Sequence, residues 1–176
     1  MRKMTKLMLG LVAPAILLAG GTASAAKITN WTYENIAAFT AFTSLNPGNP
    51  NPVVGSSPNA AAYTIGGSPA NPLAGAPTVL TWGVPQGASP SRLRLGADKV
   101  GPANVVTDGA FVPDLTLFHD NFVINLGQSL RTATLAAALV LEAVAPPAFS
   151  QGPGSLTGLF NINFTETDNA GPCTVG

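Results

Sequence analysis

The residues of this chain best suited to acid–base chemistry are one histidine and its neighbours. His119 is the only histidine, and Asp120 and Asn121 follow it directly. A histidine serves as a general base when a nucleophile lies within hydrogen-bond reach and a third group orients the ring. Ser129 and Asp114 are candidate partners, yet the sequence has no G-x-S-x-G motif to mark a nucleophile. We therefore predict no catalytic residue, and keep a hydrolase built around His119 as an alternative.

A structural role for His119 and Asn121 is the preferred interpretation. Short apolar runs at 115–118 and 122–125 flank the polar triplet, so the triplet is expected to join two strands. Asn121 would tolerate a left-handed turn conformation there, and the imidazole would hydrogen-bond neighbouring carbonyl groups. A second turn is predicted over 126–129.

Metal-ligating residues are too few or too scattered for a site. Zinc requires three or four His, Cys or carboxylate ligands, and one histidine with one cysteine cannot provide them. The carboxylates Asp108, Asp114 and Asp120 do not form the D-x-D-x-D-G loop of a calcium site. We predict neither a metal ion nor another cofactor.

Aromatic side chains could bind sugars, because flat rings match the apolar faces of pyranoses. The candidates are Trp31, Tyr33, Tyr63 and Trp82, with the two tryptophans as the named contacts. Tryptophans of a β-sandwich usually belong to the core or to cross-strand pairs. A carbohydrate-binding module is therefore kept as the alternative function.

The first 25 residues have the layout of a secretory signal peptide. Arg2, Lys3 and Lys6 precede an apolar run over 7–19, and an A-x-A cleavage site follows at 23–25. The predicted mature domain is 26–176. It contains no second apolar run long enough to span a membrane.

The charge balance excludes a nucleic-acid surface. Removing residues 1–25 takes three of the eight cations and none of the eight acids, which leaves a net charge of −3. No basic stripe remains to attract phosphates. Charged residues form only 9% of the chain, against roughly 25% in an ordinary soluble domain. Strand edges thus have few charges that would prevent edge-to-edge pairing, and self-association is a candidate property.

Strand-like segments separated by Gly/Pro turns predict the fold. They are rich in β-branched and aromatic residues or alternate polar with apolar ones, and none carries a helix-length apolar stripe. In Ser91-Arg92-Leu93-Arg94-Leu95 the arginines share one strand face, expected to be solvated. Further strands are predicted at 27–42, 78–84, 132–143 and 156–167.

Two stretches are predicted to lack regular strands. The proline-, glycine- and asparagine-rich segment 45–77 is expected to be a long loop with a short strand near 61–65. The segment 97–110 is expected to form turns. The whole pattern predicts an all-β protein, a single antiparallel β-sandwich or jelly-roll-like domain preceded by a signal peptide.

Several short motifs, in order, carry a resemblance to a known family. They are Thr81-Trp82-Gly83-Val84-Pro85 before a Ser-Arg-Leu strand, the run 117–124 around His119 and Asn121, and the run 164–169 followed by a cysteine. With them the chain resembles the THxN family of PEP-CTERM-type exported proteins, whose related choice-of-anchor domains share an H-x-N loop. The resemblance covers most of the mature chain.

This resemblance implies a secreted or surface-bound β-sandwich of Gram-negative bacteria, with a role in extracellular polymer or biofilm matrix. Such proteins often end in an exosortase sorting signal. Two features depart from the family pattern: Phe118 stands in place of the motif threonine, and the chain lacks a Pro-Glu-Pro sequence, a closing apolar helix and a basic tail.

Cys173 is the only cysteine of the chain. An odd cysteine in an exported protein suggests an intermolecular bond, a free thiol or a missing partner. A family-like continuation would supply a second cysteine beyond residue 176, together with a final strand and an anchor. A truncated gene and an anchorless secreted form both stay open.

The function expected from these observations is structural or adhesive. The domain would act without catalysis in the bacterial envelope or extracellular matrix, on exopolysaccharide or on other matrix or surface proteins. The alternatives are the carbohydrate-binding module and the His119 hydrolase.

Overall fold

Residues 27–46, 48, 52–66, 69–87, 89–125, 128–146 and 153–164 are described by a computed structural model. The predicted signal peptide, Cys173 and residues 126–127 of the predicted turn lie outside this part of the chain. All statements below concern the described residues.

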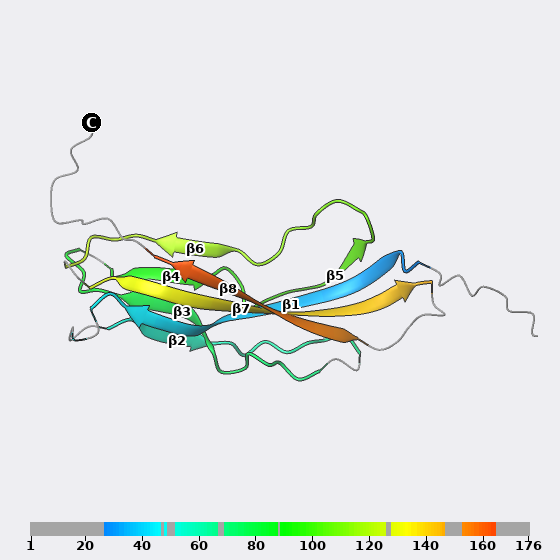
Figure 1. Cartoon of the computed structure of the whole chain (residues 1–176), viewed down its shortest axis with the longest axis horizontal. Coiled ribbons are helices and arrows are strands. Elements are labelled where there is room, and N and C mark those ends of the chain that lie inside the picture. The colour runs from blue at the N-terminus through cyan, green and yellow to red at the C-terminus, as the bar shows by residue number, and fades with distance from the viewer. Residues whose placement is uncertain are drawn as a thin grey trace, which may run out of the picture.

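Two antiparallel sheets of four strands each make up the fold, and no helix occurs among the described residues (Figure 1). The first sheet, sheet A, has the strand order β5 (Lys99–Val106), β1 (Asn30–Ser44), β7 (Leu130–Ala145), β8 (Gly154–Asn163). The second sheet, sheet B, has the order β2 (Val54–Pro58), β3 (Pro77–Trp82), β4 (Ser91–Leu95), β6 (Leu117–Asp120). This architecture confirms the predicted all-β, sandwich-like domain.

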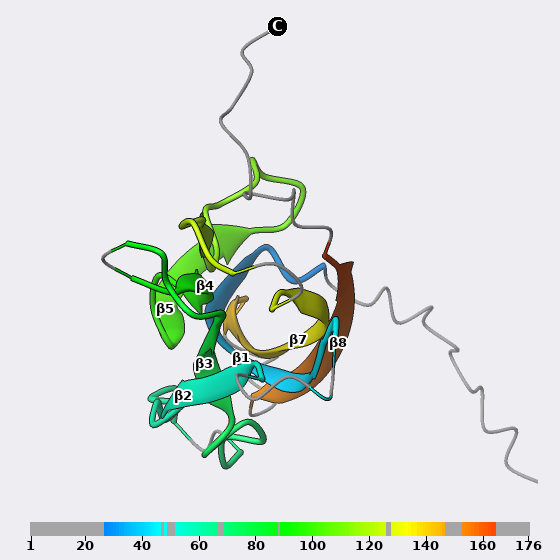
Figure 2. The ribbon, with the colours of Figure 1, turned by 90° about the vertical axis from the view of Figure 1, so that its left-hand side faces the viewer.

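The long strands β1 and β7 form the centre of sheet A. They pair along almost their whole length, from Asn30 opposite Ala145 to Ser44 opposite Leu130. The register shifts at three places along β1, and each irregularity adds local twist. Sheet A consequently curls strongly, as the end-on view in Figure 2 shows.

The main core lies between the two sheets and follows the two-residue period of the strands. In β4, Leu93 and Leu95 are buried while Arg92 and Arg94 point away from the core, as the sequence predicts. The largest fully buried side chain is Trp82 of β3. The other buried members of this core come from both sheets and the adjoining loops: Ala37, Phe39, Val53, Leu80, Ile124, Leu130 and Ala133.

A second, smaller core forms on the other face of sheet A, under the segment 59–76. Leu73 of this segment packs with Ile36 and Ala38 of β1 and with Ala136 and Ala138 of β7. Alanines at three of the four sheet positions leave room for the loop backbone to come close. The described residues 59–66 and 69–76 of the proline-rich segment therefore cover part of this sheet face.

Asn59 fixes this covering segment to β1. Its side-chain Nδ2 donates to the carbonyl oxygen of Ala37 at 2.9 Å, and its Oδ1 accepts from Asn71 Nδ2 at 2.8 Å and from the Ala61 backbone N–H at 3.1 Å. Asn71 in turn accepts a hydrogen bond from the Leu73 backbone N–H at 2.7 Å. Because buried polar groups are costly when unpaired, this network specifies one arrangement of the loop.

Two strand predictions are wrong in detail. The short strand of the 45–77 segment lies at Val54–Pro58, not near 61–65, because residues 54–58 pair with β3. The segment predicted as turns, 97–110, contains strand β5 at the edge of sheet A. Its Gly101-Pro102 sequence indicated a turn, but an edge strand tolerates proline, and Gly101 has a φ of +90° that favours glycine.

Candidate functional site

His119 lies within an edge strand. Strand β6 pairs only with β4 in sheet B, with His119 opposite Leu93 and Asp120 opposite Arg92. The prediction that the polar triplet joins two strands is therefore wrong, because His119 and Asp120 are themselves residues of strand β6. Asn121 follows the strand without the predicted left-handed conformation, since Ser57 and Asp108 are the non-glycine residues with positive φ in the described part of the chain.

The imidazole of His119 is held by aromatic rings. It stacks on the Trp82 indole with centroids 6.0 Å apart and an interplanar angle of 16°. The Phe164 ring meets it edge-on, at 4.8 Å and 86°, and also contacts Trp82 at 5.3 Å. No described residue forms a hydrogen bond with the imidazole, so the predicted bonds to carbonyl groups are absent from the described part of the chain. The contacts of the ring are aromatic instead.

The candidate partners of His119 are engaged elsewhere. The Asp114 carboxylate accepts a hydrogen bond from Asn35 Nδ2 at 2.6 Å. Ser129 is buried, and its backbone oxygen accepts from the Leu45 N–H at 2.9 Å. Among the described residues, neither Asp114 nor Ser129 forms a hydrogen bond with the imidazole.

Asp120 binds the two arginines that the sequence placed on a solvated face. Its Oδ2 accepts from Arg92 Nε at 2.5 Å and from Arg94 Nε at 2.7 Å. The Arg94 guanidinium also lies 4.4 Å from the centre of the Phe118 ring. Hydrogen bonds from Arg94 and then from Arg92 lower the pKa of Asp120, so this carboxyl group stays ionised and cannot act as a proton donor at neutral pH.

The sequence held a signal for this ion-pair cluster. Arginines two apart on β4, and an aspartate two residues beyond the apolar pair Leu117-Phe118, are compatible with neighbouring strands. The β4–β6 pairing that brings them together is a contact between residues more than 20 positions apart, and no local pattern encodes that register.

The two tryptophans do not form a binding platform. Trp82 is only 1% exposed. Trp31, on β1 of the other sheet, is half-buried, and its Nε1 donates to Thr107 Oγ1 at 2.9 Å. Of the other sugar-binding candidates, Tyr33 is buried and donates to the Pro113 oxygen, and Tyr63 donates to the Ala138 oxygen.

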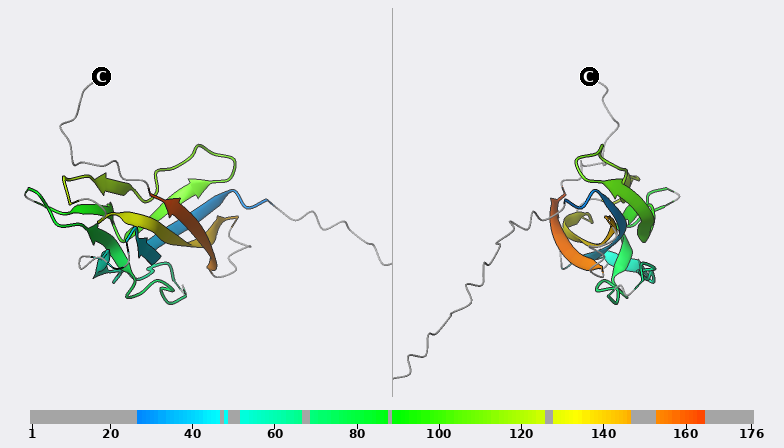
Figure 3. Two further views of the ribbon diagram at one scale, coloured as in Figure 1. Left: turned by 60° about the vertical axis from the view of Figure 1, so that its left-hand side comes forward. Right: turned by 90° about the vertical axis from the view of Figure 1, so that its right-hand side faces the viewer.

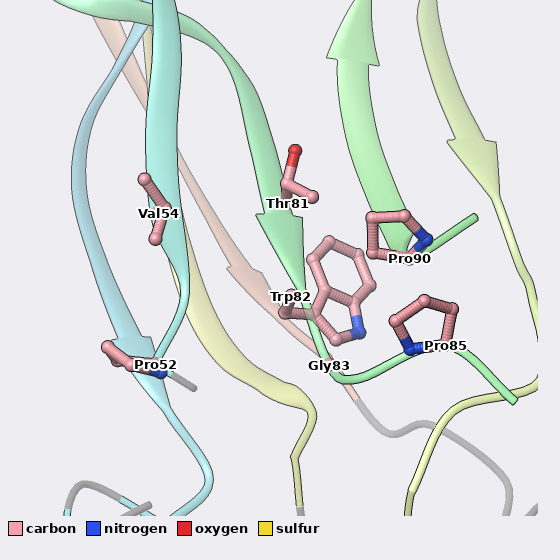
Figure 4. A pocket seen from close by; sticks show the side chains of 7 residues that line it. All are labelled: Pro52, Val54, Thr81, Trp82, Gly83, Pro85 and Pro90. Atoms are coloured by element: carbon pink, nitrogen blue, oxygen red, sulfur yellow. The ribbon is translucent and has the colours of Figure 1, made fainter. Parts of the chain in front are cut away.

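An open pocket of about 280 Å³ lies beside Trp82 (Figure 4). Its walls are mostly apolar and come from the ends of β2, β3 and β4: Pro52, Val54, Thr81, Trp82, Gly83, Pro85 and Pro90. Thr81 contributes the only side-chain hydroxyl of this lining, and no lining residue is ionisable. The side chains of this lining therefore supply one hydroxyl group and no group for general acid–base chemistry.

One side of the sandwich contains two open strand edges, those of β6 and β8. We name it the open side and define it by these two strands. The contact between His119 and Phe164 brings β6 close to the C-terminal end of β8. Neither outer edge pairs with another described strand. Figures 1 and 3 show β8 on the outside of sheet A.

Large apolar side chains are exposed on the open side. On β8, Leu156, Leu159 and Phe160 are 69%, 65% and 57% exposed. On β6, Leu117 and Phe118 are each 40% exposed. Exposed apolar residues gathered on unpaired edges are typical of interaction surfaces. The sequence predicted the alternation in β8, but not that sheet B leaves much of this strand uncovered.

Two other kinds of feature are absent from the described residues. No group of three or more His, Cys, Asp or Glu side chains is placed to hold a metal ion. Within the same part of the chain, no helix is long and apolar enough to cross a membrane.

The fold and the open side define a sandwich-like β-domain with unpaired apolar edges. Comparison with protein-family models, with curated proteins and with solved structures found no match to this chain.

Proposed function

We infer that this protein is an exported, non-enzymatic β-sandwich that works by contact in the bacterial cell envelope or extracellular matrix. The observation that carries the proposal is the open side, where β6 and β8 present unpaired edges with exposed apolar side chains. Backbone edges of this kind bind other chains by strand addition. The predicted signal peptide at 1–25 supports a location outside the cytoplasm.

The surroundings of His119 support a role without catalysis. Its ring packs on Trp82 and Phe164, and the adjacent Asp120 carboxylate is bound by Arg92 and Arg94. A general base needs a free nitrogen directed at a substrate or nucleophile. We regard the imidazole as part of the packing that holds β6 against the end of β8.

Replacing His119 tests this role. His119→Phe keeps an aromatic ring, and we expect its free energy of unfolding to stay within about 1 kcal/mol of the wild type. His119→Ala removes the ring contacts and should lose about 1–2 kcal/mol, equivalent to a drop of about 3–6 °C in Tm. Thermal and urea unfolding of the three proteins measure both effects.

The same variants test the alternative that the protein is a hydrolase with His119 as its general base. Ester, peptide and glycoside substrates should show equal background turnover with the wild type and both variants. An activity that is present in the wild type and lost in folded His119→Phe would contradict the proposal.

The location is tested by fractionation. A C-terminally tagged full chain expressed in a Gram-negative host should appear in the periplasm, on the surface or in the medium, shortened by about 25 residues as the signal-peptide layout predicts. Unprocessed protein confined to the cytoplasm would contradict export. A variant with the basic residues Arg2, Lys3 and Lys6 replaced by glutamate is the control and should be retained.

A further inference from the structure

We propose that β8 pairs with the β8 of a second copy, antiparallel and centred on Leu159, to form one continuous eight-stranded sheet. The inference names the partner for part of the open side and in that respect rests on the proposed function. The observations that carry it are the direction of the free backbone groups, the self-complementary sequence of β8 and the absence of features that block edge pairing.

The backbone direction comes from the pairing with β7. The Phe164 N–H donates to the Arg131 oxygen at 2.9 Å, and the register continues without a shift from Asn163 opposite Thr132 to Gly154 opposite Leu141. In an antiparallel pair, successive residues direct their N–H and C=O groups alternately to one neighbour and to the other. The even-numbered residues of β8 therefore bond to β7, and the odd-numbered residues direct both groups outward.

This direction limits the ways in which two copies can pair. Outward-directed residues must meet outward-directed residues, so odd-numbered positions of one copy must oppose odd-numbered positions of the other. A two-fold axis at Leu159 satisfies this condition and places Leu159 opposite itself. The other opposing pairs match in character: Phe160 with Gly158, Ile162 with Leu156, Asn161 with Thr157, and Asn163 with Ser155.

Each of these pairs is a favourable cross-strand combination. An aromatic ring can cover the space above the opposing glycine, two branched aliphatic residues pack together, and amide and hydroxyl groups hydrogen-bond. Moving the axis by one residue in either direction gives fewer matched pairs. Centred on Gly158 it sets Thr157 against Leu159, and centred on Phe160 it sets Leu159 against Asn161.

Strand β8 also lacks the features by which proteins protect an edge. It has ten residues, none of them charged and none a proline, and its register contains no bulge. Natural edge strands usually carry at least one of these. The outer strand at the other edge of sheet A, β5, differs: it contains Lys99 and Pro102, and its pairing with β1 has a register shift.

The exposed side chains of β8 gain partners in this arrangement. Ile162 and Phe164 are partly buried against the core, so Leu156 and Phe160 share their face but are left uncovered by sheet B. In each copy β6 contacts the C-terminal end of β8 through His119 and Phe164. The two-fold axis would bring β6 of the second copy toward the first copy's β8, next to Leu156 in the uncovered N-terminal half of that strand.

Sedimentation velocity of the full chain over about 1 µM to about 1 mM tests the pairing. The wild type should shift to twice the mass of a single chain as the concentration rises. Leu159→Lys and Leu159→Glu should each remain monomeric, because identical charges would oppose each other at the axis. Leu159 is 65% exposed, so both variants should keep the wild-type circular dichroism spectrum. The matched control is Val106→Lys at the other edge of sheet A, where Val106 is 57% exposed, and it should dimerise like the wild type.

Mixing the two Leu159 variants tests the register. An equimolar mixture of Leu159→Lys and Leu159→Glu should dimerise again, because opposite charges then meet at the axis. A wild type that stays monomeric, a Val106→Lys variant that loses dimerisation equally, or a mixture that stays monomeric would overturn the proposal. These results would leave the proposed function standing, which instead fails if a His119-dependent activity or a cytoplasmic location is found.

Discussion

Replacing Trp82 with alanine is expected to lower the free energy of unfolding by about 3–5 kcal/mol, the usual loss for a buried Trp or Phe side chain. The indole is 1% exposed in the core between the sheets. It also contacts the His119 and Phe164 rings. The substitution would therefore create a cavity and loosen the attachment of β6 to the end of β8.

Urea unfolding at neutral pH measures this loss. Trp31→Ala is the control, because Trp31 is the only other tryptophan and is half-buried, and its loss should be clearly smaller. The fluorescence of Trp31→Ala should be blue-shifted relative to that of Trp82→Ala, and polysaccharide should not change it. Equal losses in the two variants would contradict the assigned core position of Trp82.

Replacing Glu34 with glutamine should also destabilise the protein by about 3 kcal/mol or more, because breaking a buried ion pair leaves a charge without its partner. The Glu34 side chain is fully buried on β1. Its carboxylate accepts hydrogen bonds from the Thr64 hydroxyl and from the backbone N–H groups of Thr64 at 2.6 Å and Ile65 at 3.1 Å. Lys99 Nζ completes the shell at 3.1 Å and also donates to the Ala62 oxygen at 2.9 Å. Glutamine would lose the charge and one acceptor oxygen.

The pH dependence follows from the pKa of Glu34. Burial raises this pKa, but the hydrogen bonds from Thr64, Ile65 and Lys99 together outweigh burial and hold it below its ordinary value of 4.5. A carboxyl group with a lowered pKa in the folded state stabilises the protein above its pKa in the unfolded chain. This contribution should be complete above about pH 5 and disappear as the pH falls through the lowered pKa of the folded state.

Urea titrations of the wild type and Glu34→Gln between neutral and acidic pH measure the contribution. The difference in free energy of unfolding should be largest at neutral pH and shrink below about pH 4. Glu142→Gln on β7 is the control, because Glu142 forms no hydrogen bond or ion pair with another described residue, and we expect a change within about 0.5 kcal/mol. A difference between wild type and Glu34→Gln that stays constant into acid would show that the carboxylate charge is not its source.

The sequence predicted strands correctly where polar–apolar alternation or runs of β-branched residues were long. The predicted segments 91–95 and 132–143 lie on strands β4 and β7, and 27–42 overlaps β1 from residue 30 onward, because side-chain period and strand propensity are local properties. Strand β5 was missed because Gly101-Pro102 normally marks a turn, and only pairing with β1 makes this stretch a strand. The segment 45–77 was expected to be a long loop with a short strand near 61–65. No local pattern indicated that residues 59–66 and 69–76 cover sheet A, since their attachment depends on Asn59 reaching the Ala37 carbonyl oxygen 22 positions away.

The candidate site was likewise predictable only in those features that depend on local sequence. The sequence singled out His119 and Trp82 separately, and the structure stacks one ring on the other. Composition alone indicated strand edges with few charges, but it could not say which strand would be at an edge. That assignment depends on the order of the strands in each sheet, which arises from contacts distant in sequence.

By itself the amino-acid sequence determined the all-β class, the inward leucines and outward arginines of β4, and the uncharged, self-complementary character of β8. Only the tertiary structure decided that Glu34 is buried beside Lys99, that Trp82 is closed off from solvent, and that β8 lies at an open edge with its odd-numbered backbone groups directed outward. The physical reason is that side-chain periodicity is set by each residue's immediate neighbours. Burial, ion pairing and edge position depend instead on which distant strands meet, and in what register.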